Sequence, residues 1–172
     1  ETLVDLSLTI GRVRPEEDLA EELLQRAVGT LDAGSGLVAT LHPGGQEATV
    51  RSIGLPTSFE AVRSLFPPEL LEQLAGGRFV RIQRDDAEEP PFELLAAPLR
   101  AGREFLGVVV LGDKEARGGR ISFSDSDARF LLALGSMVAT AVATSRRVAA
   151  IERDRQRLAD ENRALRDTAR RE

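Results

Sequence analysis

The chain has 172 residues, of which 42% are hydrophobic and 30% are charged, a composition typical of a globular domain with no apolar run long enough to cross a membrane. It contains no cysteine, which excludes a disulfide scaffold, thiolate metal sites and a cysteine nucleophile, and which fits a reducing, cytoplasmic location. The net charge of −5 combines an acidic body with a basic tail from Arg146 onward, so the body lacks the basic surface that nucleic acids need.

Residues 1–14 are expected to form a helix or a linker. A second helix is predicted to begin at Pro15, because three acidic residues follow in its first turn. Leucine and alanine then recur at helical spacing as far as Leu31. Since the sequence opens with Glu1 and its only methionine is Met137, we expect it to be part of a longer protein.

The next segment changes to strand patterns. Residues 36–42 and 47–55 flank the turn-forming sequence PGGQ and predict a β-hairpin. Residues 58–77 predict two short helices, because Pro67 and Pro68 end the first helix and begin the second. The polar loop that follows the next strand, RDDAEEPP, is expected to be solvated rather than metal-binding.

A strand pair dominates the second half of the chain. A short strand over residues 78–84 precedes two apolar runs, 94–99 and 105–111, which meet across a turn at Ala101 and Gly102. Both runs are nearly continuous rather than alternating, which predicts that both faces of the sheet are covered. The last helix begins after EARGGR. The elements together predict an α+β fold built on an antiparallel sheet.

With these elements in order, the chain resembles a GAF domain, the small-molecule-sensing module of bacterial signalling proteins. The likeness is most specific in APLRAGREFLGVVVLGDK followed by FSDSDARFLLALGSMVATAVATSRR. It implies an antiparallel sheet of five to six strands flanked by helices, with a pocket near residues 54–89. We accordingly divide the chain into a leading helix or linker (1–14), a GAF-like sensor domain (15–145) and a coiled-coil linker helix (146–172).

One variant of this family binds cyclic nucleotides and carries an Asn-Lys…Phe-x-x-x-Asp-Glu signature. Here Lys114, Phe123 and Asp127 agree with that signature, whereas Asp113 and Ala128 depart from it. The alternative interpretation, which we favour, is structural. Lys114 and Asp127 would form a salt bridge, Phe123 would pack beneath the last helix, and Ser124 would cap it in a capping box with Asp127.

We predict no cofactor, no metal site and no catalytic residue. Attachment of a bilin needs a cysteine, and haem is not expected because the lone His42 lies beside a Gly-Gly turn. A phosphate-binding loop and a nucleophile elbow are both missing, so the chain is not expected to be an enzyme.

Four arginines lie on or beside the elements that bound the implied pocket. If they line it, they would hold an anionic small molecule, since guanidinium groups bind carboxylates and phosphates in a bidentate manner. The alternative is that each is a solvated surface residue. These candidates are Arg51, Arg63, Arg78 and Arg81.

The last helix carries a heptad pattern that continues past the sensor domain. Its second half cannot be covered by its own chain, because a helix from Asp125 to Arg170 would be about 69 Å long and would project from a globule roughly 40 Å across. We expect this half to form a parallel two-stranded coiled coil in which Asn162 sets the register and Arg155 weakens the seam. The predicted dimer seam consists of Val148, Ile151, Arg155, Leu158, Asn162 and Leu165.

These observations predict a regulatory homodimer that relays a small-molecule or conformational signal through its C-terminal helix to an output domain. That output could be a histidine kinase, a phosphatase, a nucleotide cyclase or a transcriptional activator. Neither nucleic acid nor membrane is an expected partner of this domain. The alternatives are a ligand-free structural dimerisation module and a cyclic-nucleotide-binding regulatory domain.

Overall fold

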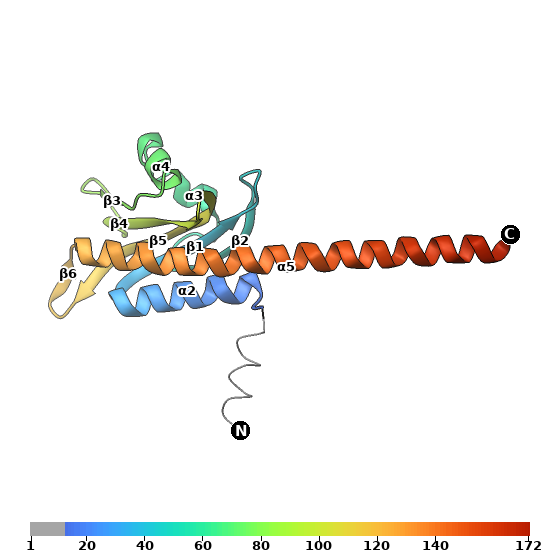
Figure 1. Ribbon diagram of the computed structural model, residues 1–172. Helices are drawn as coiled ribbons and strands as arrows, with labels where there is room; N and C mark the ends of the chain where they lie inside the picture. The colour runs from blue at the N-terminus through green and yellow to red at the C-terminus, as the bar shows by residue number, and fades with distance from the viewer. Residues whose placement is uncertain (1–12) are drawn as a thin grey trace, which may run out of the picture.

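A six-stranded antiparallel sheet lies at the centre of the computed structural model, which describes residues 13–172 (Figure 1). The strand order is β2-β1-β5-β4-β3, and β6 pairs with β5 beyond this path. The strands are β1 (Ala33–Leu41), β2 (Glu47–Ile53), β3 (Val80–Gln83), β4 (Glu93–Ala101), β5 (Glu104–Ala116) and β6 (Gly119–Ile121). The helix or linker expected over residues 1–14 falls almost wholly outside the described residues.

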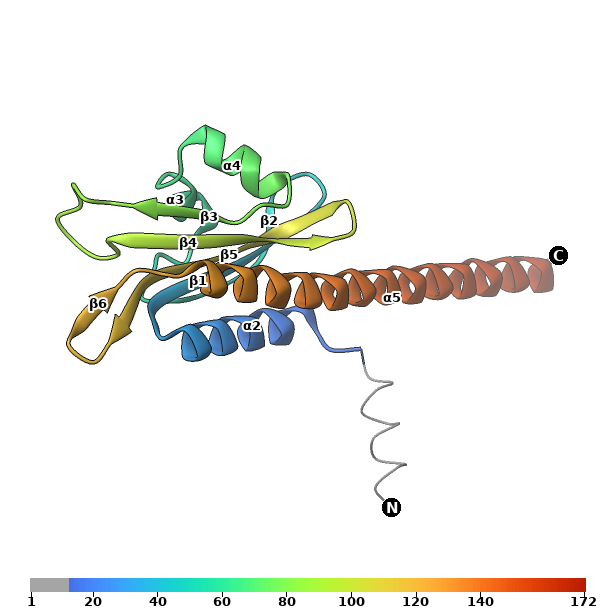
Figure 2. The same cartoon turned by 60° about the vertical axis from the view of Figure 1, so that its left-hand side comes forward.

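Helices cover both faces of this sheet, as the continuous apolar strands predict. Helices α2 (Glu16–Leu31) and α5 (Asp125–Arg171) lie side by side on one face, and α3 (Phe59–Arg63) and α4 (Pro68–Ala75) lie on the other (Figures 1 and 2). On β5, Val109 and Leu111 join the core beneath α2 and α5, whereas Val108 and Val110 join the core beneath α3 and α4. The predicted α+β, GAF-like architecture is therefore confirmed.

Local sequence signals account for most of the element boundaries. Pro67 and Pro68 separate α3 from α4, and α4 ends at Gly76. The predicted hairpin over residues 36–55 is present as β1 and β2. Strand β6 was not predicted from its own residues, although the resemblance implied a sheet of five to six strands. Arg117 and Gly118 form a tight turn, and the positive φ values of Gly118 and Gly119 let residues 119–121 pair back onto β5.

Helix α5 has 47 residues and is about 70 Å long at 1.5 Å per residue. Its first half packs on the sheet, with buried side chains as far as Ala143. Every residue from Arg147 onward is exposed, and this half extends beyond the sheet (Figure 1). The expected projection of the helix is therefore present.

The prediction that no apolar run is long enough to cross a membrane was wrong for the same helix. Within the described residues, α5 contains a stretch that is long enough and apolar enough to cross a membrane, judged by length and composition alone. Core helices of soluble proteins can be equally long and apolar, and 39% of this stretch is buried within the fold. The apolar character of this stretch reflects its packing on the sheet.

Candidate functional site

The sheet face on which a pocket was expected is filled by apolar side chains. Val62, Phe66 and Leu74 from the α3–α4 layer are almost fully buried. They belong to one cluster with Leu37 and Leu94 from the strands below. Most of the space between the short helices and the sheet is therefore occupied by the protein itself.

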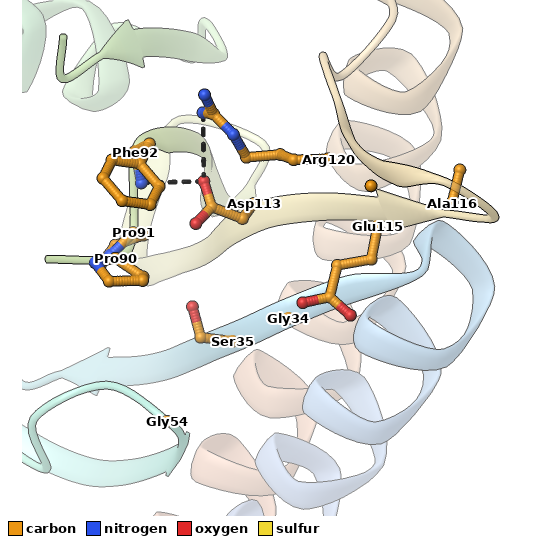
Figure 3. A pocket seen from close by; sticks show the side chains of 11 residues that line it. Gly34, Ser35, Gly54, Pro90, Pro91, Phe92, Asp113, Glu115, Ala116 and Arg120 are labelled. Carbon is orange, nitrogen blue, oxygen red and sulfur yellow. Dashed lines mark hydrogen bonds and ion pairs between the residues drawn. The ribbon is translucent and has the colours of Figure 1, made fainter.

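A cavity of about 420 Å³ lies at one end of the sheet, where β1, β5 and β6 meet the loop before β4 (Figure 3). Because Gly112 has no side chain, Ser35 of β1 and Pro91 of the loop before β4 can lie close to β5 at this point. A Cβ atom on Gly112 would lie 2.3 Å from Ser35 Oγ and 2.8 Å from Pro91 Cβ. The lining residues are Gly34, Ser35, Gly54, Pro90, Pro91, Phe92, Asp113, Glu115, Ala116, Gly119 and Arg120.

Asp113 is the most constrained residue of this cavity. It is buried and has a left-handed backbone (φ 48°) within the last part of β5. Its Oδ1 atom accepts hydrogen bonds from the backbone N–H groups of Phe92 and Glu93, each at 2.8 Å. Arg120 Nη1 lies 3.7 Å from the same oxygen, and the Arg120 guanidinium lies 4.9 Å from the centre of the Phe92 ring. Asp113 thus fastens the loop before β4 to the end of β5.

The chemistry of the cavity differs from the expected anion site. Arg120 lies beside Asp113 and the Phe92 ring, and the other polar side chains of the lining carry carboxylate and hydroxyl oxygens. Figure 3 shows the Ser35 hydroxyl and the second carboxylate oxygen of Asp113 turned toward the same space. Such a lining suits a small molecule that presents N–H or O–H donors.

A buried carboxylate links this region to the start of α5. Glu93 is 2% exposed, and its carboxylate accepts the backbone N–H of Phe123 at 3.2 Å. Burial raises the pKa of Glu93, and the N–H of Phe123 and the charge of Arg81 offset this only in part. Arg81 donates to the carbonyl of Phe123 and to Asp125, each at 2.8 Å. The backbone of Phe123 is therefore held from both sides.

The first turn of α5 contains a capping box and a salt bridge. The Ser124 hydroxyl accepts from the N–H of Asp127 at 3.1 Å, and the Asp127 carboxylate accepts from the N–H of Ser124 at 2.9 Å. Lys114 Nζ donates to the same carboxylate at 2.7 Å. Burial alone would raise the pKa of Asp127, but these hydrogen bonds and the lysine charge outweigh it and the pKa is lowered. Lys114 and Asp127 are thus engaged with each other beside the buried Phe123 ring.

The four arginines proposed to bind an anion do not come together. Arg51 lies 3.7 Å from Glu21 of α2, and Arg81 reaches the start of α5, so both extend toward the α2–α5 side of the sheet. Arg63 lies on α3 and Arg78 follows α4, and both are exposed on the opposite side. Sequence proximity to the short helices could not reveal which face of the sheet each side chain would take. The cavity residues were missed because they come from separate segments.

A second polar cluster lies where α5 leaves the globule. Arg146 donates two hydrogen bonds to the Glu16 carboxylate, at 2.8 and 3.0 Å, and Thr40 Oγ1 donates to the same carboxylate. Burial alone would raise the pKa of Glu16, but these hydrogen bonds outweigh it and the pKa is lowered. We call Glu16, Thr40 and Arg146 the exit clamp, because they join the start of α2, strand β1 and α5.

The predicted dimer seam is exposed along the whole projecting half of α5. Among the described residues, eight large apolar side chains are exposed, and six of these lie on α5. They follow the heptad spacing and start on the part of the helix that packs on the sheet. These six are Phe130, Met137, Val148, Ile151, Leu158 and Leu165.

The chain is similar to known GAF domains in sequence pattern and in fold. The family model described as the GAF domain matches residues 16–144. A solved GAF domain of an Acinetobacter phosphoenolpyruvate-protein phosphotransferase is 18% identical, with a TM-score of 0.60, and the match covers 86% of this chain and 93% of that one. The GAF domain of a putative sensor histidine kinase from Pseudomonas syringae pv. tomato is 21% identical, with a TM-score of 0.57 and coverage of 82% and 83%. No curated protein matches the chain.

A further similar structure corrects the expectation about cofactors. The GAF domain of the cyanobacteriochrome TePixJ is 11% identical, with a TM-score of 0.59, and the match covers 78% of this chain and 93% of that one. Cyanobacteriochrome GAF domains bind a bilin, so the expectation of no cofactor, which rested on the missing cysteine and the lone His42, was wrong for a domain of this fold. The missing cysteine removes only a thioether attachment. The likeness extends to the fold, and no cofactor is shown for this chain.

Proposed function

The chain belongs to the GAF domain family, whose members are sensory and regulatory domains, and we propose that it forms a parallel homodimer through α5 and relays a signal along that helix to an output domain. The domain itself catalyses no reaction in this proposal. The observation that carries it is the exposed apolar stripe on the projecting half of α5.

Burial of this stripe supplies the driving force for dimerisation. Leu158 is 54% exposed and Leu165 is 69% exposed. Fully burying a leucine contributes about 1.5–3 kcal/mol, and isolated helices have little stability of their own in water. A second copy of the chain supplies a matching stripe at the same spacing, so pairing of the two helices covers both.

Polar residues on the same helix favour the parallel arrangement. Asn162 occupies an a position, where it would meet its symmetry mate and specify a two-stranded register. Arg147 and Glu161 occupy g positions and would face Glu152 and Arg166 at the e positions of the partner, so both interchain pairs are attractive. In an antiparallel pair these matches would be lost.

The signal in this proposal begins with a small molecule in the cavity beside Asp113 and Glu115. The volume of about 420 Å³ lies within the range of small-ligand sites, and the oxygen-rich lining favours a ligand with N–H donors. The alternative is a structural dimerisation module without a ligand, which the apolar filling beneath α3 and α4 favours. A thermal-shift screen against amines, cyclic nucleotides and other metabolites separates the two, since selective stabilisation supports the sensor and none supports the structural module.

The dimer is tested by Leu158→Asp with Ala164→Asp as the matched control. Both variants place a carboxylate in the same exposed part of the helix, but Ala164 occupies a c position outside the seam. Burying a charge in the seam is expected to raise the dimer dissociation constant at least about tenfold, which corresponds to about 1.4 kcal/mol. Sedimentation equilibrium measures this constant. A monomeric wild-type chain at every concentration, or equal effects of the two variants, contradicts the proposal.

A further inference from the structure

Two paths join the cavity to the first turn of α5, and both begin at Asp113. One runs through hydrogen bonds, and the other runs along the backbone to the next residue and then through an ion pair. In the first, Asp113 Oδ1 accepts the N–H of Glu93 at 2.8 Å, and the Glu93 carboxylate accepts the N–H of Phe123 at 3.2 Å. In the second, the residue after Asp113 is Lys114, whose Nζ lies 2.7 Å from Asp127 Oδ2. Phe123 immediately precedes the Ser124 cap, and Asp127 is its reciprocal partner.

Most of the residues that make these contacts lie inside the fold. Glu93, Asp113, Phe123 and Asp127 are all buried, and buried, fully bonded polar groups resist independent movement. Asp113 also has φ 48°, a left-handed conformation that is uncommon for non-glycine residues, although aspartate adopts it more readily than most. A change in the orientation of Asp113 therefore moves its bonded neighbours on both sides.

We propose that Asp113 is a positioning residue that couples occupancy of the cavity to the first turn of α5 through Glu93–Phe123 and Lys114–Asp127. The proposal rests on the function proposed above, because it takes the cavity as the ligand site. A ligand that presents an ammonium or guanidinium group competes with Arg120 for the Asp113 carboxylate. It thereby changes how Asp113 holds the N–H groups of Phe92 and Glu93, and the change reaches both ends of the capping box.

The chain offers a way to occupy the cavity without knowing its ligand. It contains no cysteine, so Ser35→Cys introduces a single thiol into the cavity lining. Reaction with 2-aminoethyl methanethiosulfonate attaches an ammonium group there, and methyl methanethiosulfonate attaches a neutral group of smaller size. Ser64→Cys, on the exposed end of α3, carries the same tags as a control site. Should the Ser35→Cys thiol not react, Ala116→Cys provides an exposed thiol at the rim.

The readout is the amide signal of each residue in ¹H–¹⁵N spectra of the full 172-residue chain, tagged against untagged. We expect the ammonium tag in the cavity to shift the local signals of Phe92 and Glu93, and also those of Phe123 and Asp127. With Asp113→Asn, which can still accept both backbone N–H groups, the local shifts are retained and most of the shift at Phe123 and Asp127 is lost. The neutral tag and the Ser64→Cys control leave the helix signals unchanged.

Each arm can be removed separately. Lys114→Met is expected to abolish the tag-induced shift at Asp127 while that at Phe123 remains, and Glu93→Leu has the reverse effect. The coupling is overturned if the tag shifts only the local signals, or if the helix signals shift equally with Asp113→Asn. The dimer dissociation constant is measured separately, on the untagged chain. A failure of the coupling can therefore be distinguished from a failure of the proposed dimer.

Discussion

The two halves of α5 belong to one uninterrupted helix, yet different surroundings stabilise them. In the first half, Leu131 and Val142 are almost fully buried against the sheet. In the second half, Ile151 and Leu158 are more than half exposed. The exposed heptad stripe runs along both halves, from Phe130 and Met137 to Leu165, and the first half carries in addition a buried face that the projecting half lacks.

The buried face of the first half stabilises the globule, and in the proposed dimer the exposed stripe is available to a second copy. A buried residue of the first half stabilises the globule at any protein concentration, whereas in the proposed dimer a seam residue of the second half contributes only when the partner is bound. The exit clamp lies at the boundary between the two halves, where Arg146 joins α5 to α2 and β1. The predictions below test this division, from the largest effect to the smallest.

The same substitution in the two halves should have very different costs. Leu131→Ala removes a fully buried side chain and is expected to lower the free energy of unfolding of the globule by about 2–5 kcal/mol. Leu158→Ala in a dilute, monomeric sample should change it by less than about 0.5 kcal/mol. Urea unfolding followed by circular dichroism measures both. Equal costs in dilute samples would mean that the second half of α5 packs on the globule in solution.

The exit clamp should stabilise the globule in a pH-dependent manner. Glu16→Gln removes the charge that Arg146 binds and is expected to cost about 1–2 kcal/mol at neutral pH. Glu17→Gln, on the exposed side of the same turn, is the control and should cost less than about 0.5 kcal/mol.

The pKa of Glu16 is lowered in the folded chain, so its contribution is complete at pH values above the unfolded-state pKa of about 4.3. It decreases as the pH falls below that value and through the lowered folded pKa. Urea unfolding of the wild type and of Glu16→Gln at a series of pH values should therefore converge in acid. A difference that stays constant with pH would assign the cost to packing rather than to the ion pair.

Local signals in the sequence predicted the elements of the globule, but not which side chains would meet. Ser124 and Asp127 are three residues apart, so their capping box follows from the helix start alone. The cavity could not be predicted in this way, because Ser35, Phe92 and Asp113 are brought together only by the pairing of β1, β4 and β5. Asp113 carried one usable signal, since a Gly-Asp-Lys sequence that follows a long apolar strand indicates a turn or irregularity.

Loss of the cap should affect the first half of α5 alone. Ser124→Ala removes the hydroxyl that accepts the N–H of Asp127 and is expected to cost about 1 kcal/mol. Hydrogen exchange should become faster in the first turn, while the amides beyond Arg147 keep their wild-type rates. Ser126→Ala, in the same turn without a capping role, is the matched control. Faster exchange along the whole helix would show that the two halves are one cooperative unit.

The smallest effect should distinguish a parallel pair from an antiparallel one. Among the described residues Arg166 forms no ion pair, so Arg166→Glu should leave the monomer unchanged. In a parallel dimer it places a carboxylate opposite Glu161 of the second copy, and each such pair is expected to weaken the dimer by about 0.3–0.5 kcal/mol at low salt. Combining it with Glu161→Arg reverses both charges and should restore most of the lost affinity, with sedimentation equilibrium as the measurement. In an antiparallel dimer these two positions do not meet, so the second substitution would give no rescue, and the stripe on α5 would have to pair in the opposite direction.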